Sequence, residues 1–309
     1  MQEKYFHCKR NEKQAKLLRE ARVEEDVEII KDASIIALTT TGASKYHHLL
    51  QRTQPRIVVV EEAAEVLEAH IVTSLTKNCQ HLVLIGDHQQ LRPNPTVYEL
   101  AKRYHLDISF CERLIKNNFP KHRLNLQHRM RPEISHLLKI HEEFYPDLQD
   151  HDSVKAYDHV RGVEKDVFFL NHNFAETAEQ DDRSRSNKFE AEFLTGLCRY
   201  LLQQEYRPDQ ITILTAYTGQ LWCFRNLMPK SVFGSVKVCP VDRYQGEEND
   251  IILLSLVRSN DKGNIGFLKI ANRVCVALSR AKIGLYCVGT LPYFQNKTMC
   301  GKRLPTIYR

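Results

Sequence analysis

The sequence predicts an α/β protein with parallel sheets. Short, continuously apolar runs, such as IVVV at 57–60 and IILLSLV at 251–257, alternate with helical patterns from about residue 30 onward. Continuous apolar runs are typical of strands covered on both faces. Strand–helix–strand alternation implies parallel strands joined by right-handed crossovers. The length of 309 residues, at about 150 residues per domain, predicts two domains.

Each expected strand is a short run rich in apolar residues and bounded by polar or turn residues. These runs are residues 35–40, 57–60, 82–85, 123–126, 167–170, 211–215, 236–240, 251–256 and 283–288. Helical spacing of apolar residues predicts helices at 65–76, 96–104, 132–144, 188–204, 219–228 and 268–279. The charged residues 1–34 predict an entry helix, and the polar residues 146–165 predict a surface connection.

Composition excludes several classes of protein. Hydrophobic residues make up 42% and charged residues 27% of the chain, as in ordinary globular proteins. No apolar run approaches the roughly 18 residues of a membrane span, and charges near the N-terminus argue against a signal peptide, so we expect cytoplasmic residence, with the nucleus left open. Nine widely spaced cysteines without a CxxC pair argue against disulfides and against a zinc site. The net charge of +6 permits a polyanionic partner.

Acidic and amide side chains follow two of the expected strands. Glu61 and Glu62 come directly after the strand at 57–60, and a Gly–Asp pair followed by Gln90 comes after the strand at 82–85. The carboxyl ends of parallel strands form ligand sites, where one carboxylate can hold Mg²⁺ through water and another can orient a water molecule. An acidic helix N-terminus is the alternative interpretation for the glutamates. Two neighbouring clusters favour a site more than either alone.

Two arginines occupy positions suited to binding phosphate. Arg129 lies between an expected strand and a helix begun by Pro132, and Arg280 lies near the end of a mostly apolar helix. A guanidinium stays charged and matches phosphate geometry. A surface arginine and a partner of the helix dipole are the respective alternatives. Each pattern by itself leaves both interpretations open.

Taken in order, five segments resemble the motifs of superfamily 1 helicases. VEEAAE, GDHQQLRP, QHRMRP, VDRYQGEE and VALSRAK are similar to motifs II, III, the arginine-bearing segment, V and VI. The resemblance extends over about residues 34–290 and is greatest to the 5′-to-3′ branch of up-frameshift and senataxin RNA helicases, in particular to NFX-type zinc-finger helicases. It implies two RecA-like P-loop NTPase domains, 1–125 and 126–309, that bind ATP and Mg²⁺ and move on single-stranded RNA. It also associates the chain with RNA silencing or quality control.

The resemblance implies a role for each motif residue. Glu62 would activate water, Gln90 would sense the γ-phosphate, and Arg129 and Arg280 would be arginine fingers facing Glu62 across a cleft. Glu61 would bind Mg²⁺ through water, although the family usually has aspartate there, so its carboxylate is shifted by about one methylene. Further nucleotide contacts would come from Asp87, Gln127, His128, Gly246 and Glu248. His128 stands where relatives often stack a tyrosine on adenine.

The resemblance also implies a nucleic-acid path lined by hydroxyls, amides and aromatic rings. Tyr217 and Tyr244 could each stack a base for about 1–3 kcal/mol, and ordinary packing is the alternative for both. The implied contacts are Thr39, Thr40, Thr41, Gly42, Arg92, Pro93, Thr215, Tyr217, Asp242, Tyr244 and Gln245.

One motif of the family is missing from the sequence. No GxxxxGK[ST] string occurs, so no lysine on the β- and γ-phosphates and no hydroxyl ligand for Mg²⁺ can be assigned. We therefore expect a fragment or short isoform whose first RecA-like domain is truncated, with exposed apolar edges and little ATP hydrolysis of its own. A non-enzymatic RNA-binding or scaffold module on a degenerate helicase fold is the first alternative. A DNA helicase of the same superfamily is the second.

Overall fold

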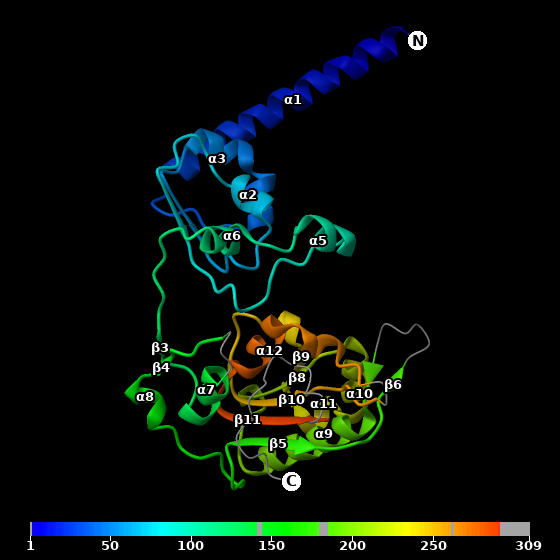
Figure 1. Cartoon of the computed structure of the whole chain (residues 1–309). Helices are drawn as coiled ribbons and strands as arrows, with labels where there is room; N and C mark the ends of the chain where they lie inside the picture. Colours follow the sequence, from blue (N-terminus) through cyan, green and yellow to red (C-terminus); the bar gives the residue numbers. More distant parts are fainter. Residues whose placement is uncertain (1, 141–143, 179–184, 261–262, 291–309) are drawn as a thin grey trace. The chain divides into compact units, whose positions relative to one another are not determined.

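The computed structural model describes residues 2–140, 144–178, 185–260 and 263–290. The chain divides into two compact parts (Figure 1). Unit 1 comprises Met1–His88 and Arg92–Phe119, and unit 2 comprises Gln89–Leu91 and all residues from Pro120 onward. The boundary between residues 125 and 126 remains a prediction, but the short segment 89–91 groups with unit 2.

The described residues of unit 1 form a small parallel sheet and six helices. Strands β1 (Ile57–Val60) and β2 (His81–Leu84) pair in parallel, with Ile57 opposite His81. The predicted entry helix is confirmed as α1 (Gln2–Lys31). The other helices are short: α2 (Thr40–Lys45), α3 (His47–Thr53), α4 (Glu68–Val72), α5 (Tyr98–Tyr104) and α6 (Phe110–Lys116).

Two sequence predictions in unit 1 are wrong in extent. Residues 35–39 form no strand, because a strand needs a ladder partner and this segment has none within the described chain. The helix expected at 65–76 is reduced to α4. Glu62, with φ 51°, opens a turn before it, and the hydroxyls of Thr73 and Ser74 donate to the carbonyl of His70 at its end.

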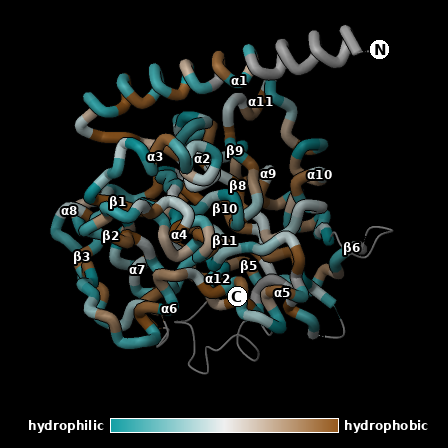
Figure 2. Tube along the Cα trace, turned by 90° about the horizontal axis from the view of Figure 1, so that it is seen from above, coloured by the Kyte–Doolittle hydropathy of each residue, from teal (hydrophilic) through white to brown (hydrophobic). Residues whose placement is uncertain are grey.

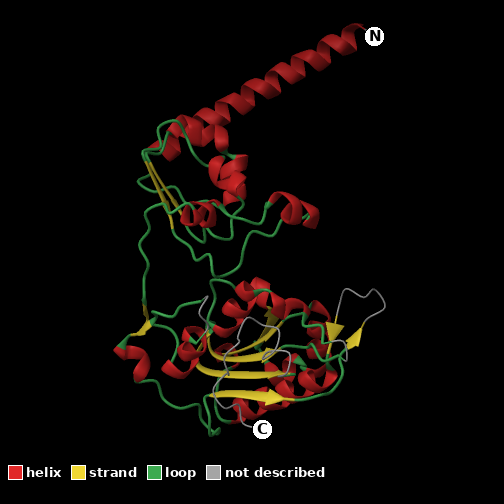
Figure 3. Ribbon diagram, viewed as in Figure 1, coloured by secondary structure: helices red, strands yellow, loops and turns green. Residues whose placement is uncertain are grey.

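Unit 2 is built around a five-stranded parallel sheet (Figure 3). Its spatial order is β5 (Val167–Asn171), β11 (Ala281–Gly289), β10 (Asn249–Ser255), β8 (Ile211–Thr215) and β9 (Lys237–Pro240). All neighbouring pairs in this sheet are parallel. The predicted α/β class with parallel sheets is confirmed.

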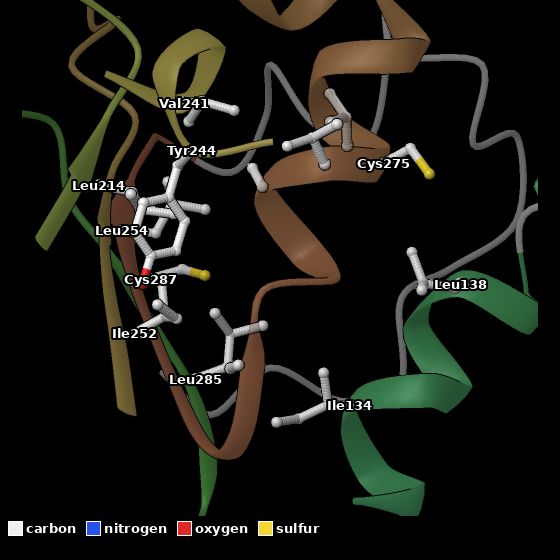
Figure 4. Packing of buried hydrophobic residues seen from close by; sticks show 14 of the residues in the cluster. Ile134, Leu138, Leu214, Val241, Tyr244, Ile252, Leu254, Cys275, Leu285 and Cys287 are labelled. Atoms are coloured by element: carbon white, nitrogen blue, oxygen red, sulfur yellow. The ribbon is translucent and has the colours of Figure 1, made fainter. Parts of the chain in front are cut away.

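Alternate side chains of this sheet enter two different cores. Ile252 and Leu254 of β10 pack in one cluster with residues of α7 (Pro132–Lys139) and α12 (Ala271–Leu278), part of which Figure 4 shows. Ile251 and Leu253 pack in the other cluster, with residues of α9 (Lys188–Gln203) and α10 (Thr218–Leu227). Because successive strand residues point to opposite faces, helices on both faces explain the continuously apolar run.

The remaining elements of unit 2 are short. They are β3 (Leu126–Gln127) paired with β4 (Gln149–Asp150), β6 (Thr177–Ala178) paired with β7 (Arg185–Ser186), α8 (Asp152–Lys155), α11 (Lys230–Phe233) and three 3₁₀ turns at Pro208–Gln210, Val241–Arg243 and Gly266–Lys269. The strand expected at 123–126 is thus only Leu126–Gln127, since no strand among the described residues pairs with residues 123–125. The connection expected at 146–165 contains β4 and α8.

No helix in the described ranges is long and apolar enough to cross a membrane. Figure 2 shows hydrophilic and hydrophobic residues interspersed along the coloured part of α1.

Candidate nucleotide and nucleic-acid site

The parallel sheet of unit 2 separates the predicted site residues into two groups. Glu248 and Arg280 directly precede β10 and β11, so they lie at the end where these strands begin, here called the amino edge. Tyr217 follows β8 and therefore lies at the opposite end, here called the carboxyl edge. Parallel strands share both ends, so Tyr217 lies at the opposite end of the sheet from Glu248 and Arg280.

Three charged side chains meet at the amino edge. Arg129 forms an ion pair with Glu248, and Lys282 binds the other carboxylate oxygen of Glu248 at 3.0 Å. Partial burial by itself raises the pKa of Glu248, but the hydrogen bond from Lys282 and the charge of Arg129 outweigh it and lower that pKa. The pKa of Lys282 is raised by the same hydrogen bond. The charge of Asp250 also raises the pKa of Lys282, so the cluster joins two cations to two carboxylates.

The guanidinium of Arg280 is fixed beside this cluster. Only 1% of the residue is exposed. Its nitrogens donate to the carbonyls of Val276 (3.1 Å) and Glu247 (3.3 Å) and to the hydroxyl of Ser279 (2.6 Å). Arg129 also donates to the carbonyl of Ser279, at 3.4 Å. The two predicted arginine fingers therefore converge on one short turn between α12 and β11.

Gln90 reaches the same turn. Arg280 donates from Nη2 to Oε1 of Gln90 at 3.1 Å, and Asn272 donates to the carbonyl of Gln90 at 2.6 Å. The next residue, Leu91, is buried and donates from its backbone to the side chain of Gln245 at 3.0 Å. A displacement of Gln90 would therefore change the hydrogen bond from Arg280 and, through Leu91, the hydrogen bond to Gln245.

Gln127 acts within the protein as an anchor for Arg129. Its side-chain oxygen accepts from the backbone of Arg129 (2.9 Å) and its amide nitrogen donates to Asp150 (2.8 Å). Burial raises the pKa of Asp150, but hydrogen bonds from Lys139 and Gln127 lower it overall. The neighbouring His128 is exposed, and its ring lies 4.1 Å from that of His151. Gln127 thus positions Arg129, while His128 presents a ring to solvent.

The predicted carboxylates of unit 1 follow its two strands. Glu61 is exposed, and Glu62 adopts φ 51° in the turn directly after β1. A backbone hydrogen bond of 2.9 Å from Ala63 to Ile85 ties this turn to the end of β2. A Cβ on Gly86 would lie 2.9 Å from the backbone nitrogen of Ala63, so only glycine fits there. Asp87 comes directly after this close approach.

At the carboxyl edge, a chain of contacts connects three loops. Thr215 is buried and its hydroxyl accepts from the backbone of Tyr217 at 3.3 Å. The hydroxyl of Tyr217 accepts from Arg258 at 3.3 Å, and Arg258 forms a buried ion pair with Glu176 at 2.8 Å. A Cβ on Gly266, whose φ is +49°, would collide with the Tyr217 hydroxyl. Tyr217 is therefore held in place by its neighbours.

Two residues predicted to contact nucleic acid make their contacts within the protein. The ring of Tyr244 lies in the hydrophobic core beside Leu214 and Leu254 (Figure 4), and its hydroxyl is 3.1 Å from that of Thr212. Burial raises its pKa. Its prediction as a base-stacking residue is corrected to ordinary packing, because 2% exposure leaves no open ring face. Asp242 binds Arg273 through both carboxylate oxygens, at 3.0 and 2.8 Å.

The remaining predicted residues lie in turns, at the start of helix α2 or in the segment 92–93. Gly246 has φ +76°, which favours glycine. In unit 1, Thr39 caps α2 by accepting from the backbone of Gly42 at 3.0 Å, and Thr40 and Thr41 form the first turn of that helix. Arg92 binds buried Glu112, and the next residue, Pro93, is buried.

Sequence reasoning missed the residues that hold the predicted ones in place. Lys282 stands two residues after Arg280, and its basic character was the available signal. Ser279, Glu176 and Arg258 lie outside the predicted site sets. No spacing in the sequence connects Glu176 to Arg258, because they are 82 residues apart and meet only at the carboxyl edge.

Comparison with known proteins agrees with the motif order. The model of an AAA domain matches residues 106–291, and a second AAA-domain model matches residues 1–98. The first match covers more than half of the chain, so the chain belongs to this family, the AAA-domain helicases of superfamily 1. The predicted family is confirmed.

Two curated relatives are similar to this chain over most of its length. The chain is similar to the NFX1-type zinc finger-containing protein 1 of Mus musculus, with 59% identity over 293 residues, 95% of this chain and 15% of that protein. It is also similar to the Schizosaccharomyces pombe helicase required for RNAi-mediated heterochromatin assembly 1, with 41% identity, 84% of this chain and 26% of that protein. The chain thus spans only a small part of these relatives.

Among solved structures, an arterivirus nonstructural protein 10 helicase matches with a TM-score of 0.39 and 12% identity, over 90% of this chain and 58% of that one.

Proposed function

We propose that this chain is part of the motor of an ATP-dependent superfamily 1 RNA helicase, in which ATP hydrolysis drives movement along single-stranded RNA. One observation carries the proposal: Arg129, Glu248 and Arg280 converge at the amino edge of the unit 2 sheet. Arg129 forms an ion pair with Glu248, and both arginines donate hydrogen bonds to Ser279. Tyr217 lies at the carboxyl edge of the same sheet. Rigid strands between these edges would transmit a change at the nucleotide to the nucleic acid.

The proposed roles follow from side-chain chemistry. Arg129 and Arg280 would stabilise charge on the transferring phosphoryl group, an effect worth about 10³–10⁵ in rate in other NTPases. Glu248 would accept hydrogen bonds from ribose hydroxyls. The contact between Gln90 and Arg280 would report the state of the phosphates to Gln245, a predicted nucleic-acid contact.

In unit 1, Glu62 would orient the attacking water. Exposed Glu61 suits Mg²⁺ bound through water, since this hard cation prefers oxygen ligands and keeps part of its hydration. Bound Mg²⁺ would neutralise phosphate charge. The lysine and hydroxyl of a phosphate-binding loop would come from residues outside this sequence, which has no GxxxxGK[ST] string.

A non-enzymatic RNA-binding module is the second candidate, favoured by the missing phosphate loop and by glutamate at position 61. The two candidates differ in how RNA affinity responds to nucleotide. The dissociation constant of the 309-residue chain for single-stranded RNA should change when ATP and Mg²⁺ are added if the motor proposal holds. If the chain binds RNA with a dissociation constant that ATP does not change, the result would favour the non-enzymatic RNA-binding module. A DNA strand of equal length, measured at the same salt concentration, tests the preference for RNA.

Steady-state ATP hydrolysis provides the second test. We expect the chain alone to show no turnover above background, with or without single-stranded RNA. If the 309-residue chain alone hydrolyses ATP robustly and Arg280→Lys abolishes this activity, the expectation that hydrolysis requires an added phosphate-binding loop is wrong. In a longer chain that supplies the loop, Arg280→Lys and Arg129→Ala should lower kcat about 10³-fold or more. Arg161→Ala, which removes an exposed arginine paired with Glu205, is the matched control and should leave kcat unchanged.

A further inference from the structure

Three phenylalanine rings form a stack at the carboxyl edge of the unit 2 sheet. The ring of Phe174 lies 4.1 Å from that of Phe189, centroid to centroid, with 25° between the planes. The ring of Phe193 continues the series at 6.5 Å and 24°. We refer to these residues as the phenylalanine stack. Phe174 is the outer ring of this series, and its ring also lies 6.0 Å from the tilted ring of His172, with 32° between the planes.

The outermost ring is open to solvent. Phe174 is 57% exposed, whereas Phe189 and Phe193 pack against the core beneath α9. An isolated exposed phenylalanine is unremarkable. An exposed ring at the end of a series of stacked rings differs, because one more flat ring can extend the series without rearranging it.

Hydrogen bonds fix the backbone of Phe174. Its N–H donates to Nδ1 of His172 at 3.1 Å, and its carbonyl accepts from Asn187 at 2.9 Å. Since Nδ1 of His172 accepts, the ring proton is on Nε2, which donates to buried Glu190 at 3.0 Å. The ring is thus presented on a fixed support, so little conformational entropy is lost when a ligand binds.

The loop that carries Phe174 is joined to the predicted nucleic-acid segment. The backbone of Glu176 donates to the carbonyl of Ser259 at 2.9 Å, and its carboxylate binds Arg258. Arg258 in turn contacts the hydroxyl of Tyr217. The loops that carry Phe174 and Tyr217 are therefore joined through the buried ion pair of Glu176 and Arg258 at the carboxyl edge.

Charge near the stack suits a polyanion. Lys188 is adjacent in sequence to Phe189; 80% of its side chain is exposed, and its ammonium lies 3.5 Å from the carboxylate of Glu192, one turn along α9. It stands at the first position of α9, a helix of 16 residues whose N-terminus carries partial positive charge. The carbonyl of Phe174 accepts from Asn187, the N-cap of α9, so the exposed ring and the helix N-terminus are near each other, as the base and the phosphate of one nucleotide require.

We infer that the phenylalanine stack is a base-binding platform, on which Phe174 stacks one base of the single-stranded nucleic acid that also contacts Tyr217. This inference rests on the proposed function, and it names Phe174 as a nucleic-acid contact outside the helicase motifs. Stacking is indifferent to base identity, as a motor that moves along any sequence requires.

The experiment measures binding of single-stranded oligoadenylate to the 309-residue chain at fixed salt concentration. Phe174→Leu keeps an apolar side chain and removes the ring, and it should weaken binding about tenfold. Phe174→Trp should restore wild-type affinity. Tyr200→Leu removes another exposed aromatic ring, at the far end of α9, and should have no effect. Thermal unfolding checks that all variants fold.

An abasic scan identifies the ligand of the ring. Removing one base at a time from the oligonucleotide should reveal one position where base removal weakens the wild-type chain but not Phe174→Leu. Equal affinity of Phe174→Leu and wild type overturns the platform while the proposed function stands. If Phe174→Leu keeps wild-type affinity for the oligonucleotide but no longer binds a protein that the wild-type chain binds, the stack is a protein-binding surface instead. A wild-type chain that binds no single-stranded nucleic acid contradicts both the proposed function and the platform.

Discussion

The two sheets of this protein have similar strand sequences but different surroundings. In unit 1, β1 reads IVVV, and the side chains of Ile57 and Val59 are 61% and 58% exposed. In unit 2, β10 contains the run IILL, and all four of these residues are buried. The first sheet has two strands and the second has five; both are drawn in yellow in Figure 3.

The difference is in the number of covered faces. In unit 1, Val58, Val60, Leu82 and Leu84 pack on one side of the sheet, while alternate residues stay open in the described structure. In unit 2, helices cover both sides. Burial contributes about 25 cal/mol per Å² of apolar surface, so each residue of β10 should stabilise its unit much more than the outward residues of β1.

The largest expected effect is a core truncation in unit 2. Leu253→Ala should lower the free energy of unfolding by about 2–5 kcal/mol, because the residue is fully buried. Val59→Ala in unit 1 should cost less than about 0.5 kcal/mol. Urea unfolding followed by fluorescence of Trp222, the single tryptophan, reports on unit 2, and hydrogen exchange of β1 reports on unit 1. Equal losses would contradict the comparison.

The turn between the strands of unit 1 should be more sensitive than its open face. Gly86→Ala brings a Cβ within 2.9 Å of backbone atoms that have no freedom to move aside as a flexible side chain would. We expect a loss of about 1–3 kcal/mol, seen as faster hydrogen exchange in β1 and β2. Gly196→Ala, on α9 with open space around its added methyl, is the matched control and should not destabilise its unit.

A smaller effect is expected at Tyr244. Tyr244→Phe removes a hydroxyl that lies 3.1 Å from that of buried Thr212, and the free energy of unfolding of unit 2 should fall by about 1 kcal/mol. Affinity for single-stranded RNA should not change, since the ring is buried. A large loss of RNA affinity without loss of stability would restore Tyr244 as a stacking residue.

The smallest effect is a pH dependence at the amino edge. The pKa of Glu248 lies below its ordinary value of 4.5, because Lys282 and Arg129 outweigh the effect of burial. Glu248 therefore stabilises the folded state above pH 4.5, and this contribution is lost as the pH falls through the lowered pKa. Glu248→Gln should cost at most ~1 kcal/mol near neutral pH, since the carboxylate is partly exposed, and nothing in strong acid.

Glu68→Gln serves as the comparison in unit 1. The hydrogen bond from Arg113 lowers the pKa of Glu68, so this variant should show the same direction of pH dependence. Denaturation midpoints measured at several pH values test both variants. A cost of Glu248→Gln that grows in acid would contradict the assigned ion pairs.

Much of the fold could be predicted from the sequence because the signals are local. The runs at 57–60 and 211–215 coincide with β1 and β8, and helix α9 differs from its predicted range by one residue. The strand expected at 35–40 fails for a different reason. Its apolar residues have strand character, but a strand exists only where a neighbour accepts its hydrogen bonds, and no local pattern specifies that neighbour.

The candidate site shows the same division between local and tertiary information. The order of the motifs by itself determined the family and nominated Glu62, Arg129, Glu248 and Arg280. Only the tertiary structure decided that Gln90 groups with unit 2, that Tyr244 is buried and that Phe174 heads a stack of rings. The physical reason is that these properties depend on contacts between segments far apart in the chain. The type and spacing of side chains within one segment do not specify which distant segment will pack against it.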